Sequence, residues 1–266
     1  MFPISDSVQR DKRPYVVWAI IGLNSLAFLY QLTMNQIEAS AFLSEYALVP
    51  RRVTDWSWAR SVGSTPAAIQ PFLTSMFLHG GILHIVLNMW TLHIFGPALE
   101  DRLGRWRFAI LYLVAGLGAG MLHVVTNWTS TVPTLGASGA IAGLIAAYAL
   151  RFPFAWVNVV VPVFLVPVFF TVPATVFAGL WFLTQVLQGT TALLAPSQGG
   201  GIAWWAHIGG FAAGWAMLRV LDRGPHVIAP ASRGRGVRLS DDSRQLPWPL
   251  SLWWAWATWW WPRPRQ

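Results

Sequence analysis

The 266-residue chain contains no cysteine and few charged residues, which make up 11% of the sequence against about 25% in soluble domains. The lack of cysteine excludes disulfides, thiolate nucleophiles and cysteine-ligated metal sites. No charged residue lies between Arg107 and Arg151, and none lies between Arg151 and Arg219. Uncharged apolar runs of this length exceed the roughly 20 residues that span a bilayer. The sequence therefore predicts a multi-pass membrane protein.

Six apolar segments are candidate membrane helices, and the charges at their ends indicate an orientation. Basic residues precede the first segment and follow the second, fourth and sixth, whereas the loops after the third and fifth carry no charge. The positive-inside rule then places both termini in the cytoplasm. We expect an all-α membrane protein, a bundle of six transmembrane helices at residues 15–33, 72–95, 106–125, 137–150, 173–188 and 203–221.

Composition divides the chain into a cytoplasmic N-terminal tail at residues 1–13, a membrane domain at 14–222 and an Arg- and Trp-rich tail at 223–266. The net charge is +8, and much of the positive charge lies in the last part. We expect this tail to contact anionic lipid and not nucleic acid, because tryptophan and arginine both favour the membrane interface. Residues 154–173 contain Pro162, Pro167 and Pro173, so they do not fit one regular helix, and we expect them to lie partly along the inner face.

Three polar side chains in these segments are predicted to lie at one depth. Asn88, Ser138 and His207 each precede, by 12 to 14 residues, the next arginine along the chain. At about 1.5 Å per residue, all three lie about 20 Å above the inner boundary. Polar groups at this depth are costly unless they are paired or face a wet cavity. The shared depth favours a polar site in the outer half of the bundle.

Small residues on two segments indicate which helices approach closely. Glycines spaced four residues apart let two helix backbones come into contact. Such a contact between the fourth and sixth segments would bring Ser138 within hydrogen-bond reach of His207. The glycines to which we assign this packing role are Gly136, Gly139, Gly143, Gly210 and Gly214.

A serine beside a histidine has the composition of a nucleophile with its general base. Ser138 opens its segment, so unpaired backbone N–H groups are expected there. His84 and Asn88 share one helix face and are candidates to add side-chain donors for an oxyanion. No Asp or Glu lies in the second to sixth segments, so we expect a Ser138–His207 dyad without a third acidic member. The zinc-protease pattern HExxH is also absent, and we predict no metal and no other cofactor.

Each of these residues also has a structural interpretation. A single serine in a membrane helix commonly bonds to its own backbone, and a single histidine there is commonly a buried core residue. His84 with Asn88 is equally compatible with a polar contact between helices. We interpret His93, His123 and His226 as structural, because they have no polar companion at a regular spacing.

The motifs together resemble those of one known family. GASGAIAG at residues 136–143 resembles the GxSGxxxG signature of rhomboid intramembrane serine proteases. AHIGGFAAG at 206–214 is similar to the family's AHxxGxxxG, and HGGILHIVLN at 79–88 to its HxxxxHxxxN. Glu100 and Gly104 match the ExxxG that follows.

The resemblance implies a six-helix bundle in which Ser138 attacks a peptide bond and His207 serves first as base and then as acid. It implies that His84, Asn88 and the Ser138 amide stabilise the oxyanion, and we expect His79 to support this site without touching the substrate. The implied substrates are single-pass membrane proteins, which enter laterally beside the fifth helix and are cut near the outer end of their membrane segment. We expect the location to be a bacterial plasma membrane.

One departure and one alternative remain. The family's first outer loop often carries a Trp-Arg pair, but here only Trp56, Trp58 and Arg60 are found, so the seating of this loop is not predicted. The alternative function is that of a catalytically silent rhomboid-fold protein that binds membrane clients. Such proteins typically lack the serine or the histidine, and since both are present we favour proteolysis.

Overall fold

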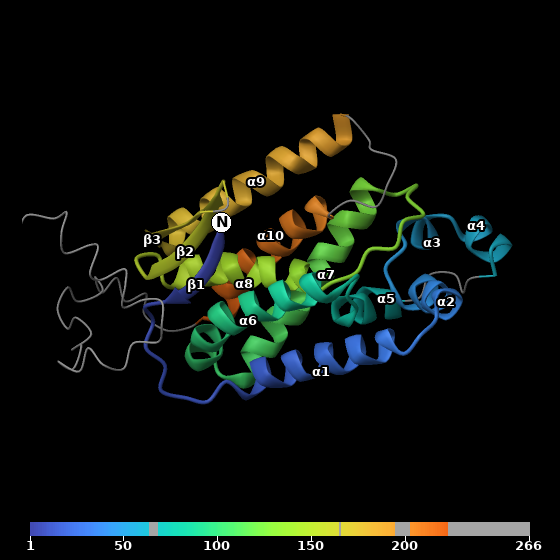
Figure 1. Ribbon diagram of the computed structural model, residues 1–266. Coiled ribbons are helices and arrows are strands. Elements are labelled where there is room, and N and C mark those ends of the chain that lie inside the picture. The colour runs from blue at the N-terminus through green and yellow to red at the C-terminus, as the bar shows by residue number, and fades with distance from the viewer. Residues whose placement is uncertain (64–68, 165, 195–202, 223–266) are drawn as a thin grey trace, which may run out of the picture. The chain divides into compact units, whose positions relative to one another are not determined.

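The computed structural model describes residues 1–63, 69–164, 166–194 and 203–222, so His226 and the Trp-rich tail lie outside the described residues. Its six long helices match the six predicted segments in number and order (Figure 1). Among the described residues, α1, α6 and α7 are long and apolar enough to cross a membrane, and α8 is a shorter apolar helix. The bounds of the long helices are α1 Tyr15–Leu32, α6 Ile82–Leu103, α7 Arg105–Thr126, α8 Ser138–Arg151, α9 Ala174–Leu194 and α10 Trp204–Leu221.

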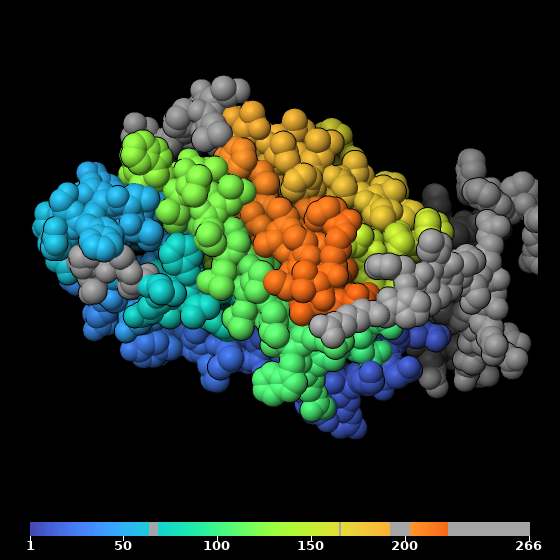
Figure 2. Space-filling model, turned by 180° about the vertical axis from the view of Figure 1, so that it is seen from behind, coloured from blue at the N-terminus to red at the C-terminus, as the bar shows by residue number. Residues whose placement is uncertain are grey.

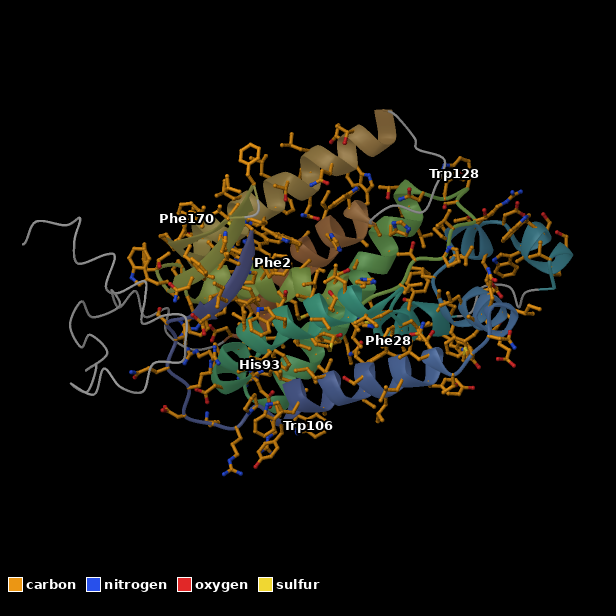
Figure 3. The ribbon with its side chains drawn as sticks, viewed as in Figure 1. Phe2, Phe28, His93, Trp106, Trp128 and Phe170 are labelled. Carbon is orange, nitrogen blue, oxygen red and sulfur yellow. The ribbon has the colours of Figure 1, made fainter. Side chains whose placement is uncertain are left out.

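The lateral surface of the helices carries large apolar side chains. Trp106 is 84% exposed and Trp128 is 64% exposed, and they stand at the two ends of α7 (Figure 3). A helix of 22 residues is about 33 Å long, which is close to the thickness of a hydrocarbon core. Tryptophans at both ends of such a helix are typical of the two membrane interfaces.

The second predicted segment differs most from the structure. We expected one helix over residues 72–95, but a short helix α5 (Gln70–Thr74) and a 3-10 turn η1 (Ser75–Phe77) come first, and α6 begins only at Ile82. Gly80 and Gly81 precede α6, and adjacent glycines disfavour helix. The side chain of Gln31 accepts a hydrogen bond from the His79 amide at 3.0 Å and donates to its carbonyl at 3.1 Å. The break is therefore held in place by α1.

The C-terminal end of α6 continues eight residues beyond the predicted end, because charged residues there have partners. The buried carboxylate of Glu100 accepts hydrogen bonds from the amides of Val16 at 3.0 Å and Val17 at 2.9 Å. These are first-turn amides of α1, which Pro14 does not cap. Gly104 follows with φ of +80°, a conformation that favours glycine, and it separates α6 from α7.

The all-α prediction is corrected by a small antiparallel sheet of order β1-β2-β3. Strands β2 (Trp156–Val163) and β3 (Val166–Pro173) form a hairpin between α8 and α9, in the stretch that we expected along the inner face. This stretch is rich in valine, which favours strands, and its prolines disfavour helix. Pro162 pairs with Pro167 beyond the end of β1, where β2 has a neighbour on one side only.

Strand β1 (Phe2–Asp6) comes from the segment expected to be an N-terminal tail. It pairs with β2, and the indole of Trp90 in α6 donates a 2.8 Å hydrogen bond to the carbonyl of Pro3. Tyr148 of α8 donates to the Asp6 carboxylate at 2.7 Å, and Arg10 pairs with the same carboxylate. Burial raises the pKa of Asp6 above its usual range in spite of these partners. The N-terminal segment is thus part of the packed structure.

The first outer loop contains α2 (Gln36–Tyr46), α3 (Pro50–Thr54) and α4 (Trp56–Ser61). Arg52, which the sequence analysis did not single out, is buried and donates to the carbonyls of Ser44 at 2.7 Å and Glu45 at 2.8 Å. It also donates to the Glu45 carboxylate at 3.0 Å. Leu48 pairs with Thr134, which joins the loop to the segment before α8. These contacts fix the position of the first outer loop. That position was not predicted from Trp56, Trp58 and Arg60, which all lie on α4.

The close contact of α8 with α10 positions the rest of the core. Both helices also pack against α7, and twelve of the 14 residues of α8 are buried. A Cβ at Gly143 would lie 2.7 Å from the carbonyl oxygen of Gly210. A Cβ at Gly139 would lie 2.5 Å from the Cβ of Ala119 in α7. A Cβ at Gly210 would collide with the carbonyl of Gly139. Figure 2 shows α10 lying between α7 and α9 on the face opposite to Figure 1.

This contact predicts a large difference between two glycine-to-alanine substitutions. Gly210→Ala places its methyl group against the backbone of α8, so we expect the free energy of unfolding to fall by about 1–3 kcal/mol, the usual cost of overpacking. Gly179→Ala in α9 adds the same methyl group where no atom lies within 4 Å, and serves as the control. Thermal unfolding of both purified variants in one detergent measures the effect, and equal midpoints contradict the prediction.

Candidate active site

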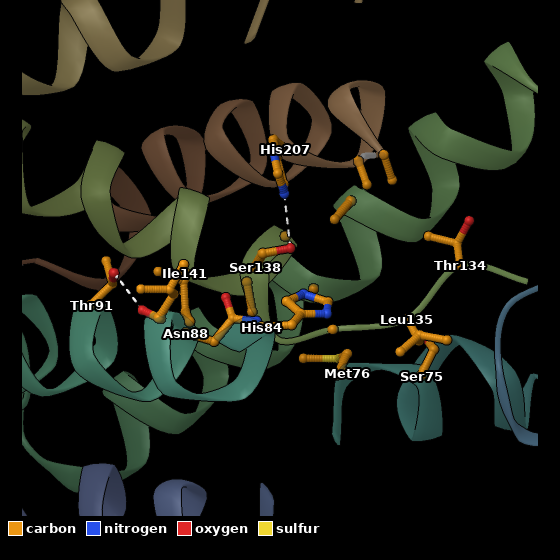
Figure 4. Close-up of a pocket in the computed structure, with 18 of the residues that line it drawn as sticks. Ser75, Met76, His84, Asn88, Thr91, Thr134, Leu135, Ser138, Ile141 and His207 are labelled. Atoms are coloured by element: carbon orange, nitrogen blue, oxygen red, sulfur yellow. Dashed lines mark hydrogen bonds between the residues drawn. The ribbon is translucent and has the colours of Figure 1, made fainter. Parts of the chain in front are cut away.

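Ser138 and His207, 69 positions apart, meet at the N-terminal ends of α8 and α10. Oγ of Ser138 lies 2.8 Å from Nε2 of His207 (Figure 4). Ser138 is the first residue of α8, and His207 lies in the first turn of α10. Both residues line a cavity of about 750 Å³. The helix contact that the glycine spacing predicted is therefore accompanied by the predicted hydrogen bond.

His84 stands on the other side of Ser138 from His207 (Figure 4). Its Nδ1 accepts a 3.3 Å hydrogen bond from the backbone N–H of Gly80. A neutral imidazole carries one proton, so that proton is on Nε2. A Cβ built at Gly136 would lie 2.8 Å from this Nε2 and 3.6 Å from Oγ of Ser138. The Nε2–H donor of His84 and the serine hydroxyl therefore both border the space beside Gly136.

Gly136 requires a correction, because it does not serve helix packing. It precedes α8, and its φ of +128° is one that side chains with a Cβ rarely adopt. Its amide donates to the carbonyl of Ser75 at 2.8 Å. A side chain at this position would displace the His84 ring of α6, so the glycine leaves room for a side chain and not for the backbone of another helix.

Asn88 lies one turn after His84 on α6 and lines the same cavity. The residue is 7% exposed, yet its side-chain nitrogen has no hydrogen-bond partner among the described residues. Buried donors are nearly always bonded, and an exception calls for an explanation. An acceptor entering the cavity would find this N–H group already in place.

The N-terminus of α8 supplies further donors. The first N–H groups of a helix have no acceptor inside the helix, and Ala137, which precedes α8, has no side-chain oxygen to cap them. The helix dipole adds partial positive charge at this end. Together with His84 and Asn88, these amides form a site for an oxygen that acquires negative charge beside Ser138.

Gln185 of α9 is a site residue that the sequence analysis missed. Its Oε1 lies 2.7 Å from Nδ1 of His207, on the opposite side of the ring from Ser138. The Trp181 ring packs against the same imidazole, with ring centroids 5.7 Å apart. A glutamine in an otherwise apolar segment is the signal that was available, but Gln188 gives the same signal and is exposed. The sequence alone does not tell which of the two faces the histidine.

The other histidines that the structure describes form no hydrogen bond with Ser138. His79 is buried behind His84, with ring centroids 5.0 Å apart. His123 of α7 lies 2.7 Å from the hydroxyl of Thr134 and so contacts the segment that leads into α8. His93 is exposed on α6. Within the described ranges, no cluster of three or more histidine or acidic side chains suited to a metal ion is found.

The N-terminal residues form part of the cavity wall. Residues 1–3 line the cavity together with Thr91 of α6 and Phe177 of α9. Strand β1 is fixed to α6 by the Trp90 bond described above. Strand β1 therefore forms one wall of the cavity that holds Ser138.

The site combines a hydroxyl nucleophile, an adjacent imidazole base and several N–H donors in one cavity. This combination is suited to attack on a carbonyl carbon with stabilisation of the resulting oxyanion.

Comparison with known proteins gives the family. Residues 66–223, more than half of the chain and including Ser138, His207, His84 and Asn88, match the Rhomboid domain.

The chain is similar to several rhomboid-like proteins. It is 29% identical to RHOMBOID-like protein 1 of Arabidopsis thaliana over 223 residues, which cover 77% of this chain and 52% of that protein. It is 41% identical to RHOMBOID-like protein 6, mitochondrial, of the same plant over 75 residues, which cover 28% of this chain and 24% of that protein. It is 34% identical to presenilin-associated rhomboid-like protein, mitochondrial, of Rattus norvegicus over 102 residues, which cover 34% and 25%. The chain thus spans about half or less of each relative, and it belongs to the rhomboid family of multi-pass membrane proteins.

Proposed function

We propose that this protein is an intramembrane serine endopeptidase with Ser138 as nucleophile and His207 as general base. The observation that carries the proposal is the 2.8 Å contact between Oγ and Nε2 at a cavity between membrane helices. Members of the rhomboid family are typically intramembrane serine proteases, which supports it.

In the first step, Nε2 of His207 takes the hydroxyl proton while Oγ of Ser138 attacks the carbonyl carbon of the scissile peptide bond. The carbonyl oxygen becomes an oxyanion, which accepts hydrogen bonds from Nδ2 of Asn88, Nε2 of His84 and the Ser138 amide. His207 then donates its Nε2 proton to the leaving nitrogen, the C–N bond breaks, and an ester to Ser138 remains.

In the second step, water replaces the departed amine. His207 removes a proton from the water as its oxygen attacks the ester carbon, and the oxyanion returns to the same donors. The C–O bond to Ser138 then breaks, and the serine oxygen regains the proton from His207. The products are a new amino terminus and a new carboxyl terminus.

The substrate class follows from where the site lies. We assign the six helices within residues 14–222 as the membrane-crossing part of the catalytic domain, to which β1 also contributes, with both termini in the cytoplasm. Ser138 begins α8 and Arg151 ends it, a separation of about 20 Å, so the nucleophile lies in the outer half of the bilayer. A single-pass membrane protein that enters beside α9 then presents the outer end of its membrane segment to Ser138.

The first test is labelling of the purified protein in mild detergent with a fluorophosphonate, which loses fluoride when an activated serine attacks its phosphorus. We expect wild type to be labelled, and we expect Ser138→Ala and His207→Ala to give no labelling. Ser138→Ala removes the nucleophile, and His207→Ala removes the base that activates it.

Ser57→Ala is the matched control, because it removes a hydroxyl from the outer loop without touching the cavity. Labelling of Ser138→Ala equal to that of wild type contradicts the assigned nucleophile. A folded wild type that is never labelled supports the client-binding alternative.

A second prediction concerns the oxyanion. Asn88→Ala removes a donor that has no other partner within the described part of the chain, so we expect kcat to fall by about 10- to 1,000-fold, the scale of a lost oxyanion donor. Thr91→Val is the control, since Thr91 also lines the cavity from α6 but bonds to the Leu87 carbonyl. Turnover of a fluorogenic membrane-segment peptide measures both variants, and equal kcat values would remove Asn88 from the oxyanion site.

A further inference from the structure

We propose that Gln185 is a positioning residue that completes a Ser138–His207–Gln185 relay and holds His207 in the tautomer that can act as a base. The proposal rests on the function proposed above. The sequence predicts a dyad, because the second to sixth predicted segments hold no acidic residue that could orient the histidine. The geometry assigns that task to the side-chain oxygen of an amide, 2.7 Å from Nδ1.

The orientation of the Gln185 amide is set by its other contacts. Its Nε2 lies 3.3 Å from the backbone carbonyl oxygen of Trp181 and 3.0 Å from the hydroxyl of Thr184. A carbonyl oxygen carries no proton and only accepts hydrogen bonds. The amide group that faces it must therefore be the NH₂, which turns Oε1 toward His207.

The amide orientation fixes the proton on His207. Oε1 of Gln185 can only accept, so Nδ1 of His207 is the donor and carries the proton. In the neutral ring Nε2 is then unprotonated, and it accepts the hydrogen bond from the hydroxyl of Ser138. The opposite tautomer would place two acceptors against each other at Nδ1 and leave no base beside the serine.

Gln185 also stabilises the protonated, positively charged ring of His207. When His207 takes the serine proton it becomes an imidazolium in a largely apolar site, next to Trp181 and near Trp204. The dipole of the Gln185 carbonyl stabilises this charge, as the aspartate does in the triad of soluble serine proteases. A neutral amide does so without a carboxylate at membrane depth, where an ionised side chain is expensive.

The hydrogen-bonded set of Ser138, His207 and Gln185 is rigid, because Trp181 and Gln185 on one turn of α9 both hold the His207 ring. Trp181 packs its ring on His207 at an interplanar angle of 40°, and its carbonyl accepts from Gln185 four residues later. The edge of Trp204 in α10 faces the same ring at an interplanar angle of 84°. Gln185 itself is 5% exposed. Its side chain therefore has little freedom to leave Nδ1.

The kinetic test compares Gln185→Leu, which has similar volume but no acceptor, with Gln185→Glu, which restores an acceptor oxygen. We expect Gln185→Leu to lower kcat by about 10- to 100-fold with KM unchanged, the scale known for losing the partner that orients a metal-binding histidine. We expect Gln185→Glu to recover most of this loss. Gln188→Leu makes the same change at an exposed position of α9 and should match wild type.

A second readout does not depend on activity. In protein labelled with ¹⁵N-histidine and reconstituted in liposomes, we expect the His207 resonances of the Nδ1-protonated tautomer, identified by their loss in His207→Ala. In Gln185→Leu we expect both tautomers. The proposal is overturned if Gln185→Leu keeps the wild-type kcat, if Gln185→Glu is no better than Gln185→Leu while both remain folded, or if the tautomer is the same in all variants. Wild-type protein that shows the expected tautomer but neither labels nor turns over would instead refute the proposed protease function and keep the positioning contact.

Discussion

The backbone contact between α8 and α10 is the constraint on which the site depends. Oγ of Ser138 and Nε2 of His207 are 2.8 Å apart only because the two helices approach at Gly143, Gly210 and Gly214 without intervening side chains. In a membrane this contact gains little from the hydrophobic effect and depends on close packing. The active site therefore lies at this close helix contact, and one methyl group added at Gly210 affects both.

Around this contact, hydrogen bonds determine which atom of His84 and of Gln185 donates and which accepts. The amide of Gly80 leaves Nε2 of His84 as a donor, and the carbonyl of Trp181 turns the oxygen of Gln185 toward His207. Since an unpaired polar group is costly in apolar surroundings, these bonds also hold the side chains in place. The same arrangement gives a base on one side of Ser138 and donors on the other.

The sequence was most informative where chemistry requires particular residues at fixed spacing. The glycine pairs predicted the α8–α10 contact, and the shared depth of Ser138 and His207 predicted their meeting. It was least informative where a partner comes from a distant segment. The valine- and proline-rich stretch becomes a sheet because β1 supplies a third strand, and Gly136 takes its role from His84. Gln185 and Gln188 look alike in sequence, and only the rotation of α9 distinguishes them. The late start of α6 likewise depends on Gln31 of another helix.

The measurement that tests the site most directly is an experimental structure of the protein after reaction with a fluorophosphonate. The bond to phosphorus should be formed by Oγ of Ser138, with the phosphoryl oxygen within hydrogen-bond distance of Nδ2 of Asn88, Nε2 of His84 and the Ser138 amide. Nε2 of His207 should remain next to the serine oxygen, with Nδ1 still on Gln185. An adduct on another residue, or a phosphoryl oxygen turned away from all three donors, would contradict the assignment of Ser138 and of the oxyanion site.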